Sequence, residues 1–128
     1  MAHTLAAGSA SITEEIFNTV KKIVWSWTSG TGETVVADCT TTTFYTGDVL
    51  FFVTVPGAGG AAPSDNYDVT ILDKDDVDIL ADAGMNRDTS STESVLAASL
   101  GTVCNSQLEL NIAGAGSANT GVVYLYIR

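Results

Sequence analysis

Apolar and polar side chains alternate with a period of two along much of the chain, which predicts β-strands. In Thr19–Thr28, Ile23, Trp25 and Trp27 fall on one face, and Lys22, Val24, Ser26 and Thr28 fall on the other. The same alternation recurs in three further segments, which are 35–40, 67–72 and 107–113. In 120–127, Val122, Tyr124 and Tyr126 lie on the face opposite Val123, Leu125 and Ile127. We expect each of these segments to be a strand with one face in the core.

Other segments have less regular patterns. Val49–Val55 is apolar on both faces, which predicts a central strand, and Val77–Leu80 is expected to return from an acidic turn as the second strand of a hairpin. Val95–Leu100 suits a short helix or an edge strand. Ser11–Phe17 has a capping box and helical spacing, but its β-branched residues favour a strand or arm.

Gly, Ser, Asn and Asp separate these segments, and no long helix or internal repeat is evident. The stretches 56–66 and 82–94 are predicted to be surface loops. Seven or eight strands in this length predict an all-β fold, an antiparallel two-sheet β-sandwich of either jelly-roll or immunoglobulin-like order. We expect residues 1–17 to form an N-terminal arm or edge strand, and residues 18–128 to form a single sandwich domain.

The composition and the net charge disfavour some classes of binding partner. The chain has 128 residues, 45% hydrophobic and 16% charged, with a formal net charge of −10. This is enough for one folded domain. The acidic balance disfavours nucleic acid and anionic membranes, because binding to either depends on Lys and Arg. No apolar run is long enough to span a bilayer, and no signal peptide is evident, so we expect synthesis in a host cytoplasm.

The sequence contains little that supports catalysis, and we predict that the protein is not an enzyme. The only histidine is His3, beside the N-terminus, which makes a nucleophile–histidine arrangement implausible. Gly57–Gly60 lacks the following Gly-Lys-Ser/Thr of a phosphate loop. Cys39 and Cys104 do not form a zinc site; they are expected to be two reduced, buried thiols, with one disulfide as the alternative. We therefore predict no catalytic, cofactor-binding or metal-binding residues and no cofactor.

Three acidic or aromatic groups have both a structural and a functional interpretation. Glu14 and Glu15 are adjacent, and neighbouring strand residues point to opposite faces, so they cannot share a glycosidase site. Asp73–Asp78 superficially resembles a calcium loop but lacks its central Gly and distal Glu, which favours an acidic hairpin turn. Trp25 and Trp27 are expected to be core residues, and the alternative is an exposed platform for a sugar or a partner chain.

The stretch Ala61–Leu80, which follows the Gly-rich loop Gly57–Gly60, combines an Ala-Pro-x-Asp-Asn-Tyr-Asp-Val-Thr strand, an acidic turn and an apolar return strand. Together with Val20–Thr28 and Gly121–Arg128, it resembles a group of small β-rich virion structural proteins of tailed bacteriophages. The likeness covers about half the chain and includes no catalytic motif. In the turn, Asp75-Asp76 stands where that group tends toward Asp-Gly, which removes the residue that most readily adopts a positive φ.

The resemblance implies a structural role on the virion. We expect a capsid decoration or cement protein on the capsid exterior, with the major capsid protein and copies of itself as partners and a homo-oligomeric arrangement on the head. A neck, tail or fibre component is one alternative. A carbohydrate-binding adhesive sandwich, with an exposed tryptophan as its stacking platform, is another.

Overall fold

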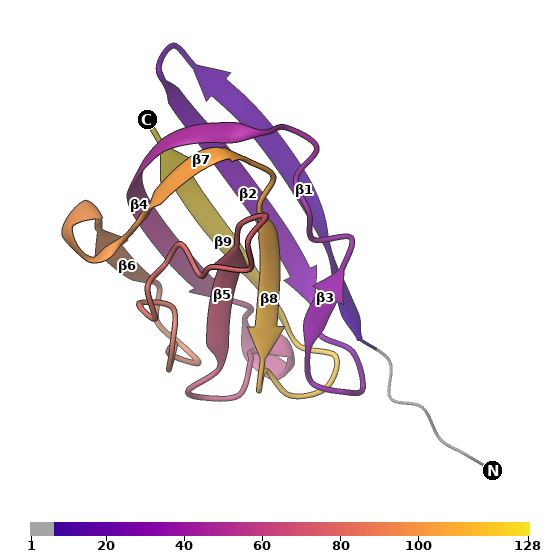
Figure 1. Cartoon of the computed structure of the whole chain (residues 1–128). Coiled ribbons are helices and arrows are strands. Elements are labelled where there is room, and N and C mark those ends of the chain that lie inside the picture. The colour runs from indigo at the N-terminus through magenta and orange to yellow at the C-terminus, as the bar shows by residue number, and fades with distance from the viewer. Residues whose placement is uncertain (1–6) are drawn as a thin grey trace.

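The chain folds as a curled, mixed β-sheet, and the computed structural model describes residues 7–128 (Figure 1). The strands are β1 (Gly8–Phe17), β2 (Val20–Thr28), β3 (Val35–Ala37), β4 (Tyr45–Pro56), β5 (Asp68–Leu72), β6 (Glu93–Leu96), β7 (Thr102–Ser106), β8 (Glu109–Ala113) and β9 (Thr120–Ile127). Two short 3₁₀ turns, η1 (Gly59–Ala61) and η2 (Ala97–Ser99), complete the elements. The predicted all-β class is confirmed. Within residues 7–128 there is no helix of the length and apolarity needed to cross a membrane.

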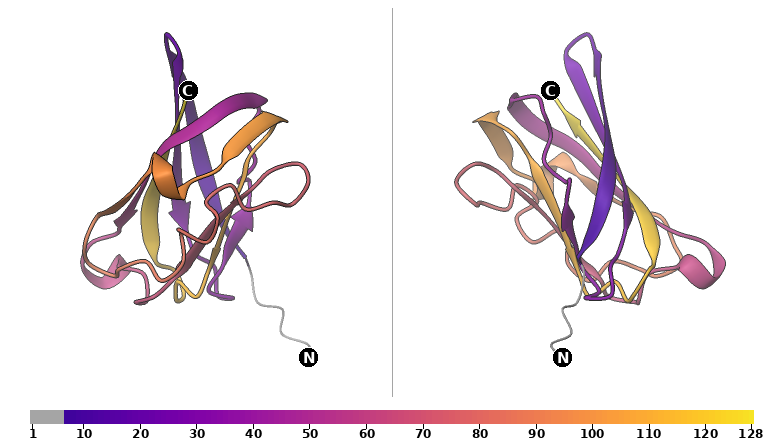
Figure 2. Two further views of the ribbon diagram at one scale, coloured as in Figure 1. Left: turned by 60° about the vertical axis from the view of Figure 1, so that its left-hand side comes forward. Right: turned by 90° about the vertical axis from the view of Figure 1, so that its right-hand side faces the viewer.

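Eight strands lie in the order β5-β8-β3-β1-β2-β9-β4-β6, and β7 pairs with the beginning of β4. The sheet curls into a half-barrel (Figure 2). The predicted two-sheet sandwich is not confirmed, because the short strand β3 links β8 to β1 and keeps both halves in one hydrogen-bonded path. The expectation of a purely antiparallel fold is wrong at one pair, since β1 and β3 run parallel.

The concave side of the half-barrel holds the core. The alternation predicted in β2 and β9 is confirmed: Ile23 and Trp25 are fully buried, and so are the inward residues of β9. The Trp25 indole Nε1 donates a hydrogen bond of 2.9 Å to the carbonyl oxygen of Cys39. The Trp27 ring lies 5.8 Å, centroid to centroid, from the ring of Tyr67, which directly precedes β5. The core therefore joins the two ends of the curled sheet.

A β-bulge near the middle of β4 changes which of its residues face the core. The register with β9 shifts between Val49, which lies opposite Ile127, and Phe51, which lies opposite Tyr126. One extra residue in β4 reverses the alternation. As a result, Val49 and Phe52 are both buried although they are three positions apart. As predicted, β4 is central and lies between β9 and β6.

The prediction that Val77–Leu80 forms the return strand of a hairpin is wrong. The Asp78 carboxylate accepts hydrogen bonds from the backbone N–H groups of Ile71, Leu80 and Asp82, and only one isolated bridge pairs this segment with β5. Ile79 and Leu80 are consecutive and both buried, which a regular strand does not permit. Two backbone hydrogen bonds, Ile79 N–H to Ile71 and Asp73 N–H to Val77, join the two segments, and local capping by Asp78 takes the place of a continuous ladder.

The ambiguous segments are resolved by their pairing. Residues 11–17 form a strand, since β1 pairs with β2 over its whole length. The segment 95–100 combines both alternatives, because β6 ends at Leu96 and η2 follows directly.

Candidate functional site

The residues that the sequence singled out do not converge on a reactive centre. Trp25 and Trp27 are 0% and 2% exposed, so neither indole provides a surface platform. The Asp73 carboxylate accepts hydrogen bonds from the N–H groups of Asp75 and Val77, which supports the interpretation as an acidic turn. Across residues 7–128, no three His, Cys, Asp or Glu side chains gather as metal ligands. His3 lies outside the described residues.

The two cysteines are free thiols in different environments. Cys39 is buried as expected, but the expectation of a buried Cys104 is wrong, because this residue is exposed on β7. No disulfide joins them. Burial, followed by the negative charges of Glu109 and Asp38, raises the pKa of the Cys39 thiol to about 11. Cys39 is therefore a structural residue, because the thiolate is the reactive form.

Glu14 has a structural partner set rather than a catalytic one. Its carboxylate accepts hydrogen bonds from the Tyr45 hydroxyl (2.7 Å), the Thr42 hydroxyl (2.9 Å), and the backbone N–H groups of Thr42 and Thr43. Burial alone would raise the pKa of this carboxyl, but the donors, with Tyr45 foremost, lower it overall. Glu14 thereby holds the segment before β4 against β1.

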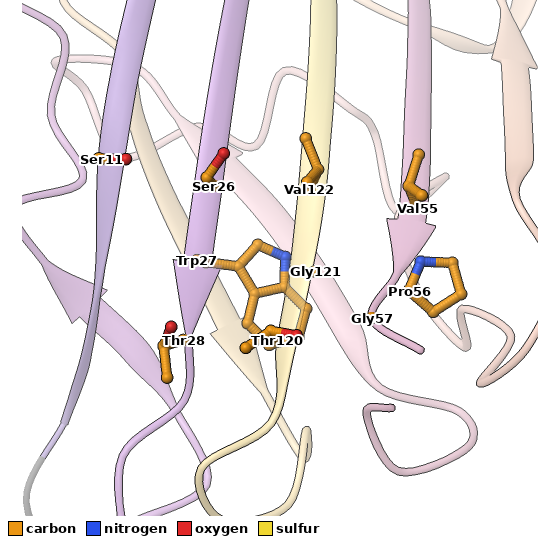
Figure 3. Close-up of a pocket in the computed structure, with 10 residues that line it drawn as sticks. All are labelled: Ser11, Ser26, Trp27, Thr28, Val55, Pro56, Gly57, Thr120, Gly121 and Val122. Atoms are coloured by element: carbon orange, nitrogen blue, oxygen red, sulfur yellow. The ribbon is translucent and has the colours of Figure 1, made fainter. Parts of the chain in front are cut away.

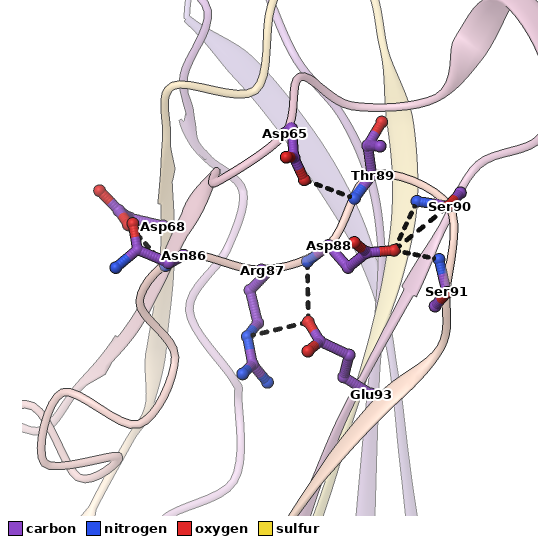
Figure 4. A network of polar contacts seen from close by, with 9 residues as sticks. All are labelled: Asp65, Asp68, Asn86, Arg87, Asp88, Thr89, Ser90, Ser91 and Glu93. Atoms are coloured by element: carbon purple, nitrogen blue, oxygen red, sulfur yellow. Dashed lines mark hydrogen bonds and ion pairs between the residues drawn. The ribbon is translucent and has the colours of Figure 1, made fainter.

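A second polar network secures the segment that precedes β6 (Figure 4). The Asp68 and Asp65 carboxylates accept hydrogen bonds from the N–H groups of Asn86 and Thr89. Arg87 lies 3.6 Å from the Glu93 carboxylate, and its guanidinium stacks over the Phe52 ring. These contacts bind a loop to the sheet.

The most distinctive surface is the convex side of β2, β9 and β4. We name as the outer face the outward side chains in the paired rows of these three strands, which are Lys22, Val24, Ser26, Thr28, Phe51, Val53, Val55, Thr120, Val122, Tyr124 and Tyr126. Seven of these eleven are apolar or aromatic, and all are at least partly exposed. An antiparallel sheet face in contact with water is ordinarily polar. The outer face departs from that pattern.

The far end of the same sheet provides an internal comparison. On β5 and β8 the outward positions include Asp68, Thr70, Glu109 and Asn111, which are the polar residues expected on a solvated face. The two convex surfaces belong to one chain and one sheet. Apolar side chains are therefore concentrated on the convex side of β2, β9 and β4, although Leu72 on β5 and Val36 on β3 also point outward. A concentrated apolar patch is typical of a contact surface for another molecule.

The strand register sorts the outer face into rows. Lys22, Tyr126 and Phe51 lie side by side across the three strands, and the next row is Val24, Tyr124 and Val53. The Lys22 ammonium lies 5.3 Å from the Tyr124 ring centroid and 5.9 Å from that of Tyr126. Phe51 and Tyr126 rings are 6.1 Å apart. The bulky end of the face is thus an aromatic cluster with a single cation.

The opposite end of the outer face is hollowed (Figure 3). A hollow of about 400 Å³ is lined by the small side chains of Ser11, Ser26, Thr28 and Thr120 together with Val55, Pro56, Gly57, Val122, Trp27 and Gly121. The Trp27 ring lies behind β9 at Gly121, where an added Cβ would come within 2.4 Å of the indole. The hollow can receive a side chain from a docked protein.

The sequence contained one signal for this face. Val122, Tyr124 and Tyr126 are apolar on the side opposite Val123, Leu125 and Ile127, so the last strand has no polar face. That pattern predicts a strand covered on both sides.

Comparisons of the chain with protein-family models, with curated proteins and with solved structures found no match.

Proposed function

We propose that this protein is a non-enzymatic virion structural protein that docks through its outer face onto a protein shell, as a decoration protein of a phage head. The observation that carries the proposal is the contrast between the apolar outer face on β2, β9 and β4 and the polar convex side of β5 and β8. The resemblance of the sequence to small phage virion proteins supports the choice of a capsid as the partner.

The chemistry of the face suits a protein partner. Burial of apolar surface contributes roughly 25 cal/mol per Å², and aromatic residues are enriched at the centres of interfaces. Tyr124 and Tyr126 supply rigid amphipathic contact area, and the hollow beside Ser26 supplies a place for an anchoring side chain. Many copies on one shell would add their individual contacts through avidity.

The charge distribution supports a position on the exterior of a particle. Eight of the fifteen acidic residues lie between positions 65 and 88, on the polar side of the molecule. The outer face has only one charged member, Lys22. Docking through this face would leave the acidic surface in solvent, where it favours solubility and repels nucleic acid.

The proposal also includes a two-layered arrangement of the core. Contact between the Trp27 and Tyr67 rings supports a sandwich-like packing of β2, β9 and β4 over β5 and β8. The curled path through β3 remains the connection between the two layers. In this arrangement the convex side of β2, β9 and β4 is free for a partner.

Cryo-microscopy of the phage particles tests the location. Density for this fold at the capsid symmetry axes, in hundreds of copies with the outer face against the shell, is the expected result. A few copies at a single vertex would instead indicate a neck, tail or fibre component. Binding to a glycan array without any binding to heads would favour the adhesive alternative.

A matched pair of variants tests the face itself. Tyr124→Asp places a charge at the centre of the outer face, and Thr70→Asp places the same charge on the polar convex side. Sedimentation with heads that lack the protein should show loss of binding for Tyr124→Asp and full binding for Thr70→Asp. Equal binding by both variants, with unchanged thermal unfolding, would contradict the proposal.

A further inference from the structure

The two ends of the outer face differ in the size of their side chains. At one end, Phe51 and Tyr126 lie side by side with their ring centroids 6.1 Å apart, and together they form a bulky aromatic end. At the other end of the same strands, Thr120 has a small side chain and Gly57 has none, and the hollow of about 400 Å³ lies there (Figure 3). One face therefore contains both a bulky feature and a space that can receive it.

The bulky and small positions correspond on two neighbouring strands. Tyr126 and Thr120 are separated by about 20 Å along β9, at about 3.4 Å per residue. Phe51 and Gly57 have the same spacing along the path of β4, and the Gly57 N–H donates a hydrogen bond of 2.9 Å to the carbonyl oxygen of Thr120. The row of Tyr124 lies between the two ends. Reversal of the strand direction thus superimposes the bulky positions on the small ones.

We infer that the free protein forms a symmetric dimer through its outer face, in which the aromatic end of each copy packs into the hollow of the other. A two-fold axis that lies in the plane of the contact, perpendicular to the strands, places each strand over its own counterpart in the opposite direction. Tyr126 of one copy then lies over Thr120 of the second copy, and Phe51 lies over Gly57. Tyr124 lies near the axis and contacts the equivalent residues of the second copy.

The shape of the face makes a second copy the occupant. If the two-fold axis were parallel to the strands, the aromatic ends of the two copies would meet, and the two hollows would face each other without a side chain to fill them. Specific interfaces pack as densely as protein interiors, so the arrangement that fills both hollows is favoured. The face is therefore self-complementary in one orientation.

The charges on this side of the sheet are compatible with the same orientation. Lys22 lies at the aromatic end, and Glu15 lies beside it on β1. The residues that line the hollow are uncharged, and Ser11, Ser26 and Thr28 supply hydroxyl groups. Reversal of the strands places each Lys22 ammonium over hydroxyl oxygens, which can accept its hydrogen bonds. Like charges on these strands therefore lie at opposite ends of the contact.

The dimer concerns the protein before it docks, and it rests on the outer face of the proposed function. Covering this face reduces the exposed apolar patch of the free chain. The face measures about 20 Å along the strands and about 15 Å from β1 to β4, which is small beside the roughly 1,200–2,000 Å² that stable interfaces bury in total. The dimer is therefore weak and reversible. One face cannot contact a shell and a second copy together, so docking onto a shell dissociates the dimer.

Analytical ultracentrifugation over a concentration series up to about 1 mM tests the dimer. The unmodified chain should show a reversible monomer–dimer equilibrium. Thr120→Tyr, which fills the hollow, and Tyr126→Ser, which removes the inserted ring, should each weaken it at least about ten-fold. Thr70→Tyr, on the polar convex side of β5, is the matched control and should leave the equilibrium unchanged. A chain that stays monomeric throughout, or equal weakening by the control, would overturn the inference.

Cross-linking tests the direction of the strands. In a Cys104→Ser background, chains with Lys22→Cys are mixed with chains with Thr28→Cys and treated with a thiol cross-linker that spans about 10 Å, the spacing of packed sheets. Linked pairs of the two different variants are the expected product. If Lys22→Cys chains link to one another as readily as to Thr28→Cys chains, the strands are not reversed and the inference fails.

Heads that lack the protein separate this inference from the proposed function. The cross-linked dimer should not sediment with heads, whereas the same chains before cross-linking should. A cross-linked dimer that binds heads as well as the free chain does would contradict a shared face. A chain that dimerises but never binds heads would contradict the proposed function and leave the dimer intact. A chain that binds heads but stays monomeric would contradict only the dimer.

Discussion

Replacement of Glu14 by glutamine tests how the open side of the half-barrel is held together. The carboxylate accepts four hydrogen bonds, at 2.7 Å from the Tyr45 hydroxyl, 2.9 Å from the Thr42 hydroxyl, and 3.1 and 3.2 Å from the backbone N–H groups of Thr42 and Thr43. Glutamine retains one oxygen and adds an amide donor that faces other donors. At least one of the four hydrogen bonds is therefore lost, and those that remain lose the charge of the acceptor.

The expected loss of stability follows from these contacts. A hydrogen bond to a charged group contributes about 1.5–3 kcal/mol when it is well shielded, but Glu14 lies at the edge of the sheet and is screened by water. We expect Glu14→Gln to lower the free energy of unfolding by about 1–2 kcal/mol at pH 7. Glu15→Gln is the control, because Glu15 is exposed on the opposite face of β1 and should change stability by less than about 0.5 kcal/mol.

The pH dependence has a definite sign. The pKa of the Glu14 carboxyl is lower in the folded chain than its ordinary value, because the hydrogen-bond donors outweigh the effect of burial. The stabilisation is therefore present above the ordinary glutamate pKa of about 4.3, and it is lost as the pH falls through the lower folded value. The difference between the unmodified chain and Glu14→Gln should shrink as the solution is acidified.

Urea unfolding followed by tryptophan fluorescence, from pH 7 to pH 3, measures this difference. Both indole rings are buried, so their emission reports on unfolding. A stability difference that stays constant over this pH range would refute the assignment of the effect to the Glu14 charge. An equal loss in Glu15→Gln would refute its assignment to the hydrogen bonds with Tyr45, Thr42 and Thr43.

Two further changes probe the core and the thiols. Gly121→Ala should destabilise the fold by about 1–3 kcal/mol, because its Cβ would lie 2.4 Å from the Trp27 ring. Gly60→Ala is the control: its Cβ meets no atom within 4 Å, so it should have little effect in the same urea assay. A thiol reagent at pH 8 should modify one cysteine, Cys104, in the native chain and both after denaturation, because Cys39 is buried with a raised pKa. Rapid modification of Cys39 in the native state would contradict the described core.

The strand pattern of this protein could be predicted from local sequence. In a β-strand the side-chain direction depends only on whether a position is odd or even, so the alternation in β2, β5, β8 and β9 was visible without any neighbour. The same local rule failed at Val77–Leu80, where the Asp78 side chain supplies the hydrogen bonds that a partner strand would make. It also could not locate the bulge in β4, which is defined only by the register with β9.

The candidate docking face was within the sequence but could not be recognised there. The pattern of residues 122–127 predicted a strand with two apolar faces, and it left open whether a second layer of the same chain covers the outer one. Only the tertiary structure decided this, because burial of a strand face depends on which elements pack against it. Likewise, the approach of Glu14 to Tyr45, and the separation of the apolar and polar convex sides, arise from the curl of the sheet. The local sequence thus determined which residues form strands and which face each side chain takes, and long-range packing determined which of those faces remain available to a partner.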